Sequence, residues 1–131
     1  MRRRLAFAVL PLLALVACQA PQPSGPAPAT VVFFNADSAA LDEKAQAIVA
    51  QAAGLAKERP AAAVRVRGFA APDSGTAAFN KALAGLRAQN VADNLAAAGV
   101  ERGRIRIESR GAVPFDSFPT ESRRVEIVIG Q

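Results

Sequence analysis

The stretch GFAAPDSGTAAFNKALAGLRAQNV, residues 68–91, decides the fold. Its segment APDSG, residues 71–75, is rich in turn-forming residues and therefore predicts a loop. The residues after it predict a helix over about 76–98, which ends before Gly99 because glycine readily adopts the left-handed conformation found after helix C-termini. The expected buried side of this helix carries four large apolar residues: Phe79, Leu83, Leu86 and Leu95.

Upstream of this stretch, the sequence predicts a strand, a helix and a second strand. The run TVVFF, residues 30–34, is β-branched and aromatic, which suits a strand buried on both faces. Apolar residues then recur at spacings of four and three, which indicates a helix that Pro60 ends. The expected buried stripe of that helix comprises Leu41, Ala45, Ile48, Ala52 and Leu55. Alternation of valine and arginine over residues 64–67 predicts a strand with one solvated face, closed by Gly68.

Downstream, the sequence predicts two more strands with a loop between them. Isoleucines alternate with charged residues over 104–108, which indicates a third strand. Residues 111–122 contain two prolines and predict a loop, and the alternation over 124–129 predicts a fourth strand. The order β-α-β-α-β-β predicts an α+β fold, a two-layer α/β sandwich in which two helices cover one face of a four-strand mixed sheet.

The length and the reactive residues restrict what the chain does. Its 131 residues amount to one domain, and we expect residues 30–131 to form the folded part. One cysteine and no histidine exclude zinc sites built from His and Cys, Ser-His-Asp and Cys-His catalysis, and an internal disulfide. The sequence shows no nucleophile–base pair and no metal-ligand cluster, so we expect neither an enzyme nor a bound cofactor or metal.

The net charge of +5 overstates the charge of the folded part. Arg2, Arg3 and Arg4 lie in an N-terminal segment that we expect to be removed. Without them, 13 of the 16 basic residues remain against 11 acidic residues, a net charge of +2. A nearly balanced domain lacks the basic footprint of nucleic-acid-binding proteins, so we expect no nucleic-acid partner.

Residues 1–17, MRRRLAFAVLPLLALVA, predict a signal peptide. Three arginines precede an uncharged apolar run over 5–17, which is shorter than the roughly 20 residues that a membrane-spanning helix needs. The tetrapeptide Leu15-Val16-Ala17-Cys18 resembles the bacterial lipoprotein box, in which a peptidase cuts before the cysteine and the thiol carries a diacylglycerol. The alternative is an ordinary secretory signal followed by a coincidental cysteine.

Lipidation of Cys18 implies a membrane anchor with a tether. Two or three acyl chains hold a protein firmly, because each buried CH₂ contributes about 0.8 kcal/mol. Gln19, rather than Asp, follows the cysteine, and by resemblance to enteric sorting rules this favours the outer membrane. Residues 18–29 form a linker rich in proline and alanine. At about 3.3–3.6 Å per residue, the 11 residues 19–29 reach at most roughly 35–40 Å.

The stretch 68–91 also resembles the OmpA-like peptidoglycan-binding domains, the family of the Pal-type outer-membrane lipoproteins. That family shows Gly-His-Thr-Asp, then a Gly, and then Asn, Leu-Ser and Arg-Ala along a helix. The matching residues here are Gly68, Gly75, Asn80, Leu83, Arg87 and Ala88. Segments 33–41, 110–114 and 122–125 are similar to the family's first strand, a loop and its last strand. The resemblance therefore covers residues 30–131.

This resemblance implies a lipid-anchored lipoprotein of the outer membrane, whose domain faces the periplasm and binds peptidoglycan non-covalently. In the family, a pocket holds the zwitterionic tip of the diaminopimelate in the stem peptide. An arginine clamps its carboxylate and an acid meets its ammonium group. Arg87 matches that arginine, Asn80 lies two turns earlier on the same helix face, and Arg123 matches a third contact.

The acid is where the sequence departs from the family. Ala70 and Ala71 stand where the family has Thr-Asp, and Asp73 follows two positions later. Two interpretations of Asp73 are open: it contacts the ligand from a reshaped loop, or it caps the helix N-terminus. Losing one charged partner in a buried ionic pocket costs about 2–5 kcal/mol.

The other candidates have structural interpretations as well. Arg87 would be a solvated helix arginine, Asn80 a polar residue of the first turn, and Arg123 a strand-edge charge. Asp37 and Ser38 are predicted to form a cap or turn, or else to line the pocket.

A second hypothesis of function follows from the two alanines at 70 and 71. Without polar groups there, the OmpA-like fold would act as an interaction module that contacts an envelope protein in the periplasm. Arginines also alternate on the second and third strands, at Arg65, Arg67, Arg104 and Arg106. They are predicted to form a solvated face paired with Glu108 and Glu126, or else a basic binding face.

Overall fold

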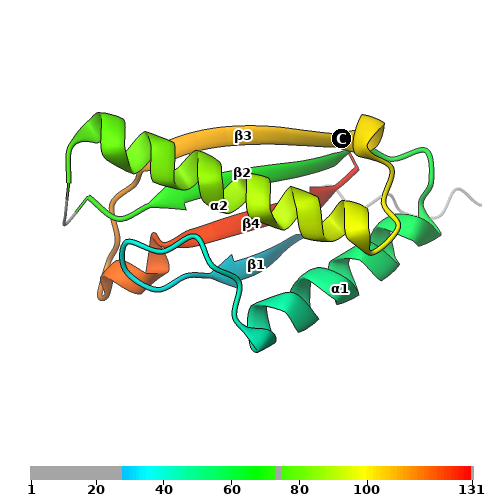
Figure 1. Ribbon diagram of the computed structural model, residues 1–131, viewed down its shortest axis with the longest axis horizontal. Helices are drawn as coiled ribbons and strands as arrows, with labels where there is room; N and C mark the ends of the chain where they lie inside the picture. The colour runs from blue at the N-terminus through cyan, green and yellow to red at the C-terminus, as the bar shows by residue number, and fades with distance from the viewer. Residues whose placement is uncertain (1–27, 73–74, 131) are drawn as a thin grey trace, which may run out of the picture.

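The computed structural model describes residues 28–72 and 75–130, and the predicted signal peptide, Cys18, most of the linker and Asp73 lie outside them. The described chain forms β1 (Ala29–Phe33), α1 (Glu43–Glu58), β2 (Val64–Ala70), α2 (Ala77–Ala97), β3 (Ile105–Ala112) and β4 (Arg124–Ile129). Short 3₁₀ turns at Arg102–Arg104 and Pro119–Glu121 precede β3 and β4. Figure 1 shows both helices on the same face of the sheet. The predicted α+β sandwich is therefore confirmed.

The four strands form one mixed sheet in the order β1-β4-β2-β3. β4 is antiparallel to both of its neighbours, whereas β2 and β3 pair in parallel and are connected through α2. The last strand in the sequence thus lies in the interior of the sheet, and β1 and β3 are its edges. β1 and β2 run in the same direction, so both end at the side of the sheet where β4 begins.

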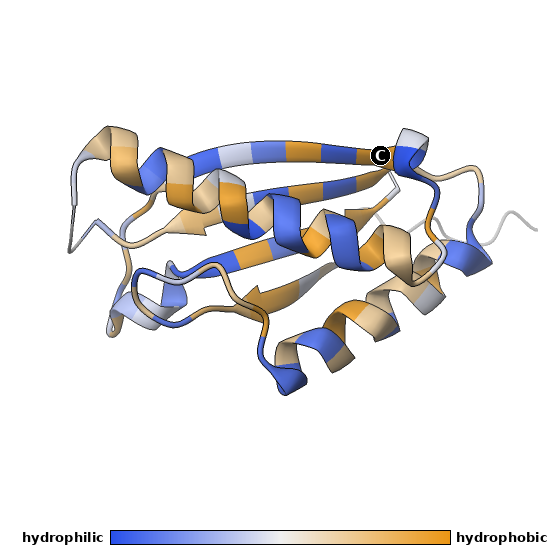
Figure 2. Cartoon of the chain, viewed as in Figure 1, coloured by the Kyte–Doolittle hydropathy of each residue, from blue (hydrophilic) through white to orange (hydrophobic). Residues whose placement is uncertain are grey.

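The core lies between the sheet and the two helices. Its most completely buried branched aliphatic members are Val32, Val64, Val66, Val125 and Ile127 from the sheet, and Val49, Val91 and Leu95 from the helices. Each is at most 1% exposed, and burial of an aliphatic side chain of this size contributes about 1.5–3 kcal/mol. Figure 2 shows apolar and polar residues alternating along β3 and β4, as expected for strands with one buried face.

Close approach of the helices to the sheet explains the many buried alanines. Ala84 and Ala88 of α2 are 0% exposed and lie against Gly68 of β2. A Cβ at position 68 would clash with the backbone carbonyl of Ala84. Position 68 therefore requires glycine, because no side chain fits between the strand and α2.

The same close approach makes part of the predicted helix pattern wrong. Leu83 and Leu95 are buried as predicted, but three large apolar residues are about half exposed. These are Leu55 (50%), Phe79 (46%) and Leu86 (57%). Alanines fill much of the contact between the helices and the sheet, and these three larger residues lie at its flanks. The buried stripe of α1 comprises Ala45, Val49, Ala52, Ala53 and Ala56.

Two strand predictions are also corrected. β2 does not close at Gly68 but continues to Ala70, with a register shift between Gly68 and Phe69. β1 is not buried on both faces, because Phe33 is 51% exposed. The physical reason is its position: β1 is an edge strand, and the helices cover only one face of the sheet. β3 likewise continues to Ala112, beyond the alternating residues.

Candidate functional site

Two of the predicted site residues, Arg87 and Arg123, interact at the end of the sheet where β1 and β2 end, and a third, Asn80, lies two turns before Arg87 on the same face of α2. Loop 34–42 leaves β1 there and runs beside α2 (Figure 1). Asn90 of α2 holds this loop, since its Nδ2 donates a hydrogen bond of 2.7 Å to the carbonyl oxygen of Ala39. We call this region the Arg87 site, and it comprises Asp37, Asn80, Arg87 and Arg123.

Arg87 is the buried centre of the site. Its side chain is 1% exposed, so it is not the solvated helix arginine of the alternative interpretation. Its Nε donates to the carbonyl oxygen of Ser38 (2.8 Å), Nη1 to that of Phe69 (3.1 Å) and Nη2 to that of Asn35 (3.0 Å). The guanidinium thereby joins α2, the end of β2 and the loop after β1, which fixes the shape of the site.

The electrostatics of Arg87 identify its charged neighbours. Burial lowers the pKa of Arg87, because a charged guanidinium is less well solvated inside the protein. The positive charge of Arg123 lowers it further, whereas the negative charge of Asp37 raises it. One cation, Arg123, and one anion, Asp37, thus act on the charge of Arg87.

Asn80 lies on the same face of α2, seven residues before Arg87. It is 4% exposed, and its backbone N–H donates to the carbonyl oxygen of Thr76 (2.9 Å). No hydrogen bond joins the Asn80 carboxamide to another described residue, and its polar atoms are not among the fully buried atoms that lack a partner. The carboxamide is therefore a polar group that a ligand could contact.

Thr76, not Asp73, is the N-cap of α2. The Oγ1 of Thr76 accepts a hydrogen bond of 3.1 Å from the backbone N–H of Phe79. The capping role considered for Asp73 therefore belongs to Thr76. The alternative role of Asp73, contact with a ligand, concerns a residue outside the described ones.

Arg123 and Asp37 approach Arg87 from two other elements. Arg123 directly precedes β4 and is half-buried, and its carbonyl oxygen accepts a hydrogen bond of 2.8 Å from the N–H of Phe34. Asp37 is exposed on loop 34–42 and has a φ of 50°, in the left-handed region that aspartate tolerates better than most residues. Asp37 was predicted to form a cap or turn, or else to line the pocket. The sequence feature that points to it is the polar segment Asn35-Ala-Asp-Ser38, which follows a strand that ends beside β2.

Ala70 and Ala71 complete this end of the sheet without a polar side chain. They are 1% and 4% exposed, and the carbonyl oxygen of Ala70 accepts a hydrogen bond of 2.9 Å from Val113. Both alanines pack as core residues at the positions where the resemblance places Thr-Asp. Any acid for a cationic ligand group must therefore come from another segment.

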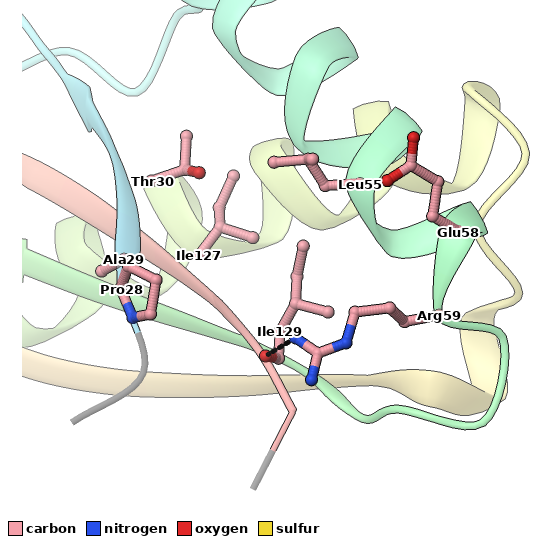
Figure 3. Close-up of a pocket in the computed structure, with 8 residues that line it drawn as sticks. All are labelled: Pro28, Ala29, Thr30, Leu55, Glu58, Arg59, Ile127 and Ile129. Atoms are coloured by element: carbon pink, nitrogen blue, oxygen red, sulfur yellow. Dashed lines mark hydrogen bonds between the residues drawn. The ribbon is translucent and has the colours of Figure 1, made fainter. Parts of the chain in front are cut away.

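A separate pocket of about 270 Å³ lies at the opposite end of the sheet, where β1 begins and β4 ends (Figure 3). Leu55, Ile127 and Ile129 give it aliphatic walls, and Glu58 and Arg59 lie at its margin. Arg59 Nη1 donates to the carbonyl oxygen of Ile129 at 3.3 Å. None of the predicted site residues lines this pocket.

Within residues 28–72 and 75–130, the side chains do not suggest a metal centre. No three His, Cys, Asp or Glu side chains gather closely enough to hold an ion in that part of the chain. None of the helices described there has the length and apolar character needed to span a membrane.

The chain is similar in sequence to known proteins. The sequence profile of the OmpA family matches residues 33–126. The chain belongs to the OmpA family. A curated relative, outer membrane protein 40 of Porphyromonas gingivalis (strain ATCC BAA-308 / W83), is 39% identical over 82 residues, which is 63% of the chain. The chain spans only 21% of the length of that relative.

Solved structures of OmpA family members share the fold. The peptidoglycan-associated lipoprotein from Burkholderia pseudomallei is 26% identical, with a TM-score of 0.70 over 76% of the chain and 89% of the other structure. The C-terminal domain of Helicobacter pylori MotB is 25% identical, with a TM-score of 0.69 over 79% of the chain and 84% of that domain. The predicted resemblance to OmpA-like domains is thus confirmed.

Proposed function

We propose that this OmpA family chain binds peptidoglycan non-covalently at the Arg87 site, with the diaminopimelate side chain of the stem peptide as the ligand. The observation that carries the proposal is the buried Arg87 guanidinium, which three backbone carbonyls hold in place near Arg123 and Asp37. Burial and the positive charge of Arg123 disfavour the charged guanidinium, and the negative charge of Asp37 offsets part of this cost. A ligand carboxylate beside these two cations relieves that cost, so an anionic group is favoured at this place.

The two arginines have different tasks in this proposal. Three of the five N–H donors of Arg87 already bind backbone carbonyls, and only 1% of its surface is exposed. Arg87 therefore fixes the loop over 35–38 and supplies positive potential. Arg123 is half-buried, so its guanidinium is the group that reaches the ligand carboxylate. The Asn80 carboxamide adds a polar contact beside it.

The acid that meets the ligand ammonium is Asp37 in this proposal. It is exposed, acts electrostatically on Arg87, and lies on the loop that Arg87 holds. Asp73, which lies outside the described residues, is a second candidate. Ala70 and Ala71 contribute no charge. Binding through these groups makes and breaks no covalent bond, in keeping with the expectation that the chain is not an enzyme.

Co-sedimentation with purified cell-wall sacculi tests this function. We expect retention on sacculi that contain diaminopimelate, and much weaker retention on sacculi with lysine in its place, because lysine lacks the second carboxylate. Arg123→Gln and Asp37→Asn should each weaken retention by about tenfold or more, since each removes one partner of a charge pair. Arg102→Gln is the matched control, because it removes one charge at the far end of α2. Equal retention of all four proteins contradicts the proposal.

We also propose that Cys18 is lipidated and anchors the chain in the outer membrane, with residues 1–17 removed, residues 18–29 as the linker and the domain in the periplasm. The fold supports this arrangement, because the chain enters β1 at the end of the sheet opposite the Arg87 site. A tether attached there leaves the site facing away from the membrane. The mass of the mature N-terminus tests it: the chain should begin at Cys18 and carry an acyl mass that Cys18→Ser lacks. A mature wild-type N-terminus without an acyl mass contradicts lipid anchoring.

A second candidate function is that of a protein-interaction module with the same fold. The buried alanines at 70 and 71 favour it, because they leave this segment without polar groups for a peptidoglycan ligand. Absence of binding to either type of sacculus, together with a specific cross-link to one envelope protein, would support this function over the first.

A further inference from the structure

The face of the sheet opposite the helices carries an unusual group of side chains, and we call it the open sheet face. Cross-strand partners define it: Arg65 faces Arg106, and Arg67 lies between Glu108 and Glu126. Val31 and Phe33 of β1 face Glu126 and Arg124. Arg110 belongs to it as well, since its Nη2 lies 2.7 Å from Glu108 Oε2. No described element covers this face (Figure 1).

The open sheet face holds the surplus positive charge of the described chain. It carries five arginines, two glutamates and no lysine. Residues 28–72 and 75–130 otherwise contain eight basic and eight acidic residues, so charge is balanced elsewhere. Arg104, predicted to lie with these arginines, does not: it donates hydrogen bonds to the carbonyl oxygens of Ala56 (2.8 Å) and Arg59 (2.7 Å). The predicted pairing with Glu108 is confirmed for Arg65 and Arg67, whereas the predicted partner Glu126 pairs instead with Arg124 at 3.0 Å.

The carboxylates of this face do not satisfy its arginines. Glu108 alone is shared by Arg65 (3.2 Å), Arg67 (3.3 Å) and Arg110 (2.7 Å). The Nε of Arg67 is buried and lacks a hydrogen bond of acceptable geometry. Arg106 is exposed and pairs with no acid of the described chain. Arg65, Arg67 and Arg110 thus compete for one carboxylate and Arg106 has none, so an incoming carboxylate would find guanidinium donors to pair with.

Apolar surface adjoins these charges along β1. Phe33 is 51% exposed and Val31 is partly exposed, while Arg124 lies 4.4 Å from the centre of the Phe69 ring. Arginine and aromatic residues are enriched at protein–protein interfaces and lysine is depleted there, as on this face. The two glutamates would repel a continuous array of phosphates. A polypeptide, however, can place its carboxylates over the arginines alone.

We propose that the open sheet face docks an acidic polypeptide segment of a partner protein. Its carboxylates pair with Arg65, Arg67 and Arg106, and its apolar side chains pack on Val31 and Phe33. This interaction goes beyond peptidoglycan binding and uses the opposite face of the sheet, so both ligands can be bound at once.

Fluorescence anisotropy of the full chain with a labelled peptide of alternating glutamate and valine tests the proposal. At physiological ionic strength, where charges beyond roughly 8 Å are screened, we expect saturable binding. The double variant Arg65→Gln/Arg106→Gln should weaken it about tenfold or more, and the matched double variant Lys44→Gln/Arg102→Gln less than about twofold. The Arg65→Gln/Arg106→Gln protein should still co-sediment with diaminopimelate sacculi, which separates this proposal from the proposed function.

Three results would overturn the proposal. One is a peptide that does not bind saturably to the wild-type chain. A second is equal weakening by the two double variants, because that shows a general effect of net charge. The third is tighter binding of phosphatidylglycerol vesicles or of double-stranded DNA than of the peptide, with the same dependence on Arg65 and Arg106. Circular dichroism of each variant confirms that the fold is intact.

Discussion

Arg87 and the arginines of the open sheet face lie on opposite sides of one sheet and are held in opposite ways. Arg87 is buried and binds three backbone carbonyls, which orient the guanidinium but carry no net charge. Arg65, Arg67 and Arg110 are a quarter to a half exposed and share the carboxylate of Glu108. The hydrogen-bond partners of Arg87 are thus neutral, and the anion that acts on its charge is Asp37 of the neighbouring loop, whereas the arginines of the open face are partly neutralised by direct ion pairs and remain partly solvated.

The largest expected difference between the two groups is in stability. Arg87→Leu leaves the carbonyl oxygens of Ser38, Phe69 and Asn35 without their donors. We expect it to lower the free energy of unfolding by about 3–5 kcal/mol, measured by urea denaturation. Arg110→Gln, at an exposed side chain, should lower it by less than about 1 kcal/mol. If Arg87→Leu were as stable as Arg110→Gln, the organising role of Arg87 would be wrong.

A second variant tests how Arg87 is brought into the site. Gly68→Ala places a Cβ against the carbonyl of Ala84, so α2 must move away from β2. Overpacking of this kind costs about 1–3 kcal/mol in urea denaturation. Because Arg87 is carried on α2, retention on sacculi should fall too, although no group of the site has been removed. Gly103→Ala is the control, since a Cβ at that position meets open space. If Gly68→Ala were retained on sacculi as well as wild type, binding at the Arg87 site would not depend on the packing of α2 against β2.

Acid titration separates the two groups in another way. Burial alone would raise the pKa of Glu108, but hydrogen bonds from Arg110 and Arg65 outweigh it and hold the pKa below its usual value. A lowered carboxylate pKa gives stability that is fully present above the unfolded pKa of about 4.3 and is lost as pH falls through the folded pKa. We therefore expect the free energy of unfolding to fall less for Glu108→Gln than for wild type as the pH is lowered from 5. Urea denaturation at each pH measures this difference. Identical acid slopes for the two proteins would show that the ion pairs of the open face contribute nothing.

The smallest expected effect is that of Arg106→Gln. This side chain is exposed and pairs with no described acid, so its loss should change the free energy of unfolding by less than about 0.5 kcal/mol. Retention on sacculi should also stay at the wild-type level. A destabilised Arg106→Gln protein would mean that the residue has a structural role, and that the open sheet face is not a surface kept free for a partner.

Much of the fold follows from local patterns in the sequence. The alternation over 124–129 and the glycine at position 99 are local features of the sequence. β4 and the C-terminal end of α2 therefore lie where they were predicted. The exposure of Leu55 and Leu86 was not predictable in this way. It depends on how closely alanines let the helices approach the sheet, a property of the whole layer.

The part of the candidate site that depends on local sequence patterns was predictable as well. The register from Asn80 to Arg87 is a helix property, and both side chains are buried on one face of α2 as the pattern implies. Asp37 and the three carbonyl partners of Arg87 come from segments distant in the sequence. They meet Arg87 only because β1 and β2 end at the same side of the sheet, which depends on the strand order β1-β4-β2-β3.

The most direct test of the central claim is a nuclear magnetic resonance titration of the chain with a soluble muropeptide that contains diaminopimelate. We predict saturable shifts of the backbone amides of Asn35–Ser38 and Arg123 and of the Asn80 side-chain amide, with little change at Arg65 and Arg106. A muropeptide with lysine in place of diaminopimelate should shift them far less. Shifts confined to the open sheet face, or no shifts at the Arg87 site, would contradict the claim that this buried arginine organises a peptidoglycan-binding site.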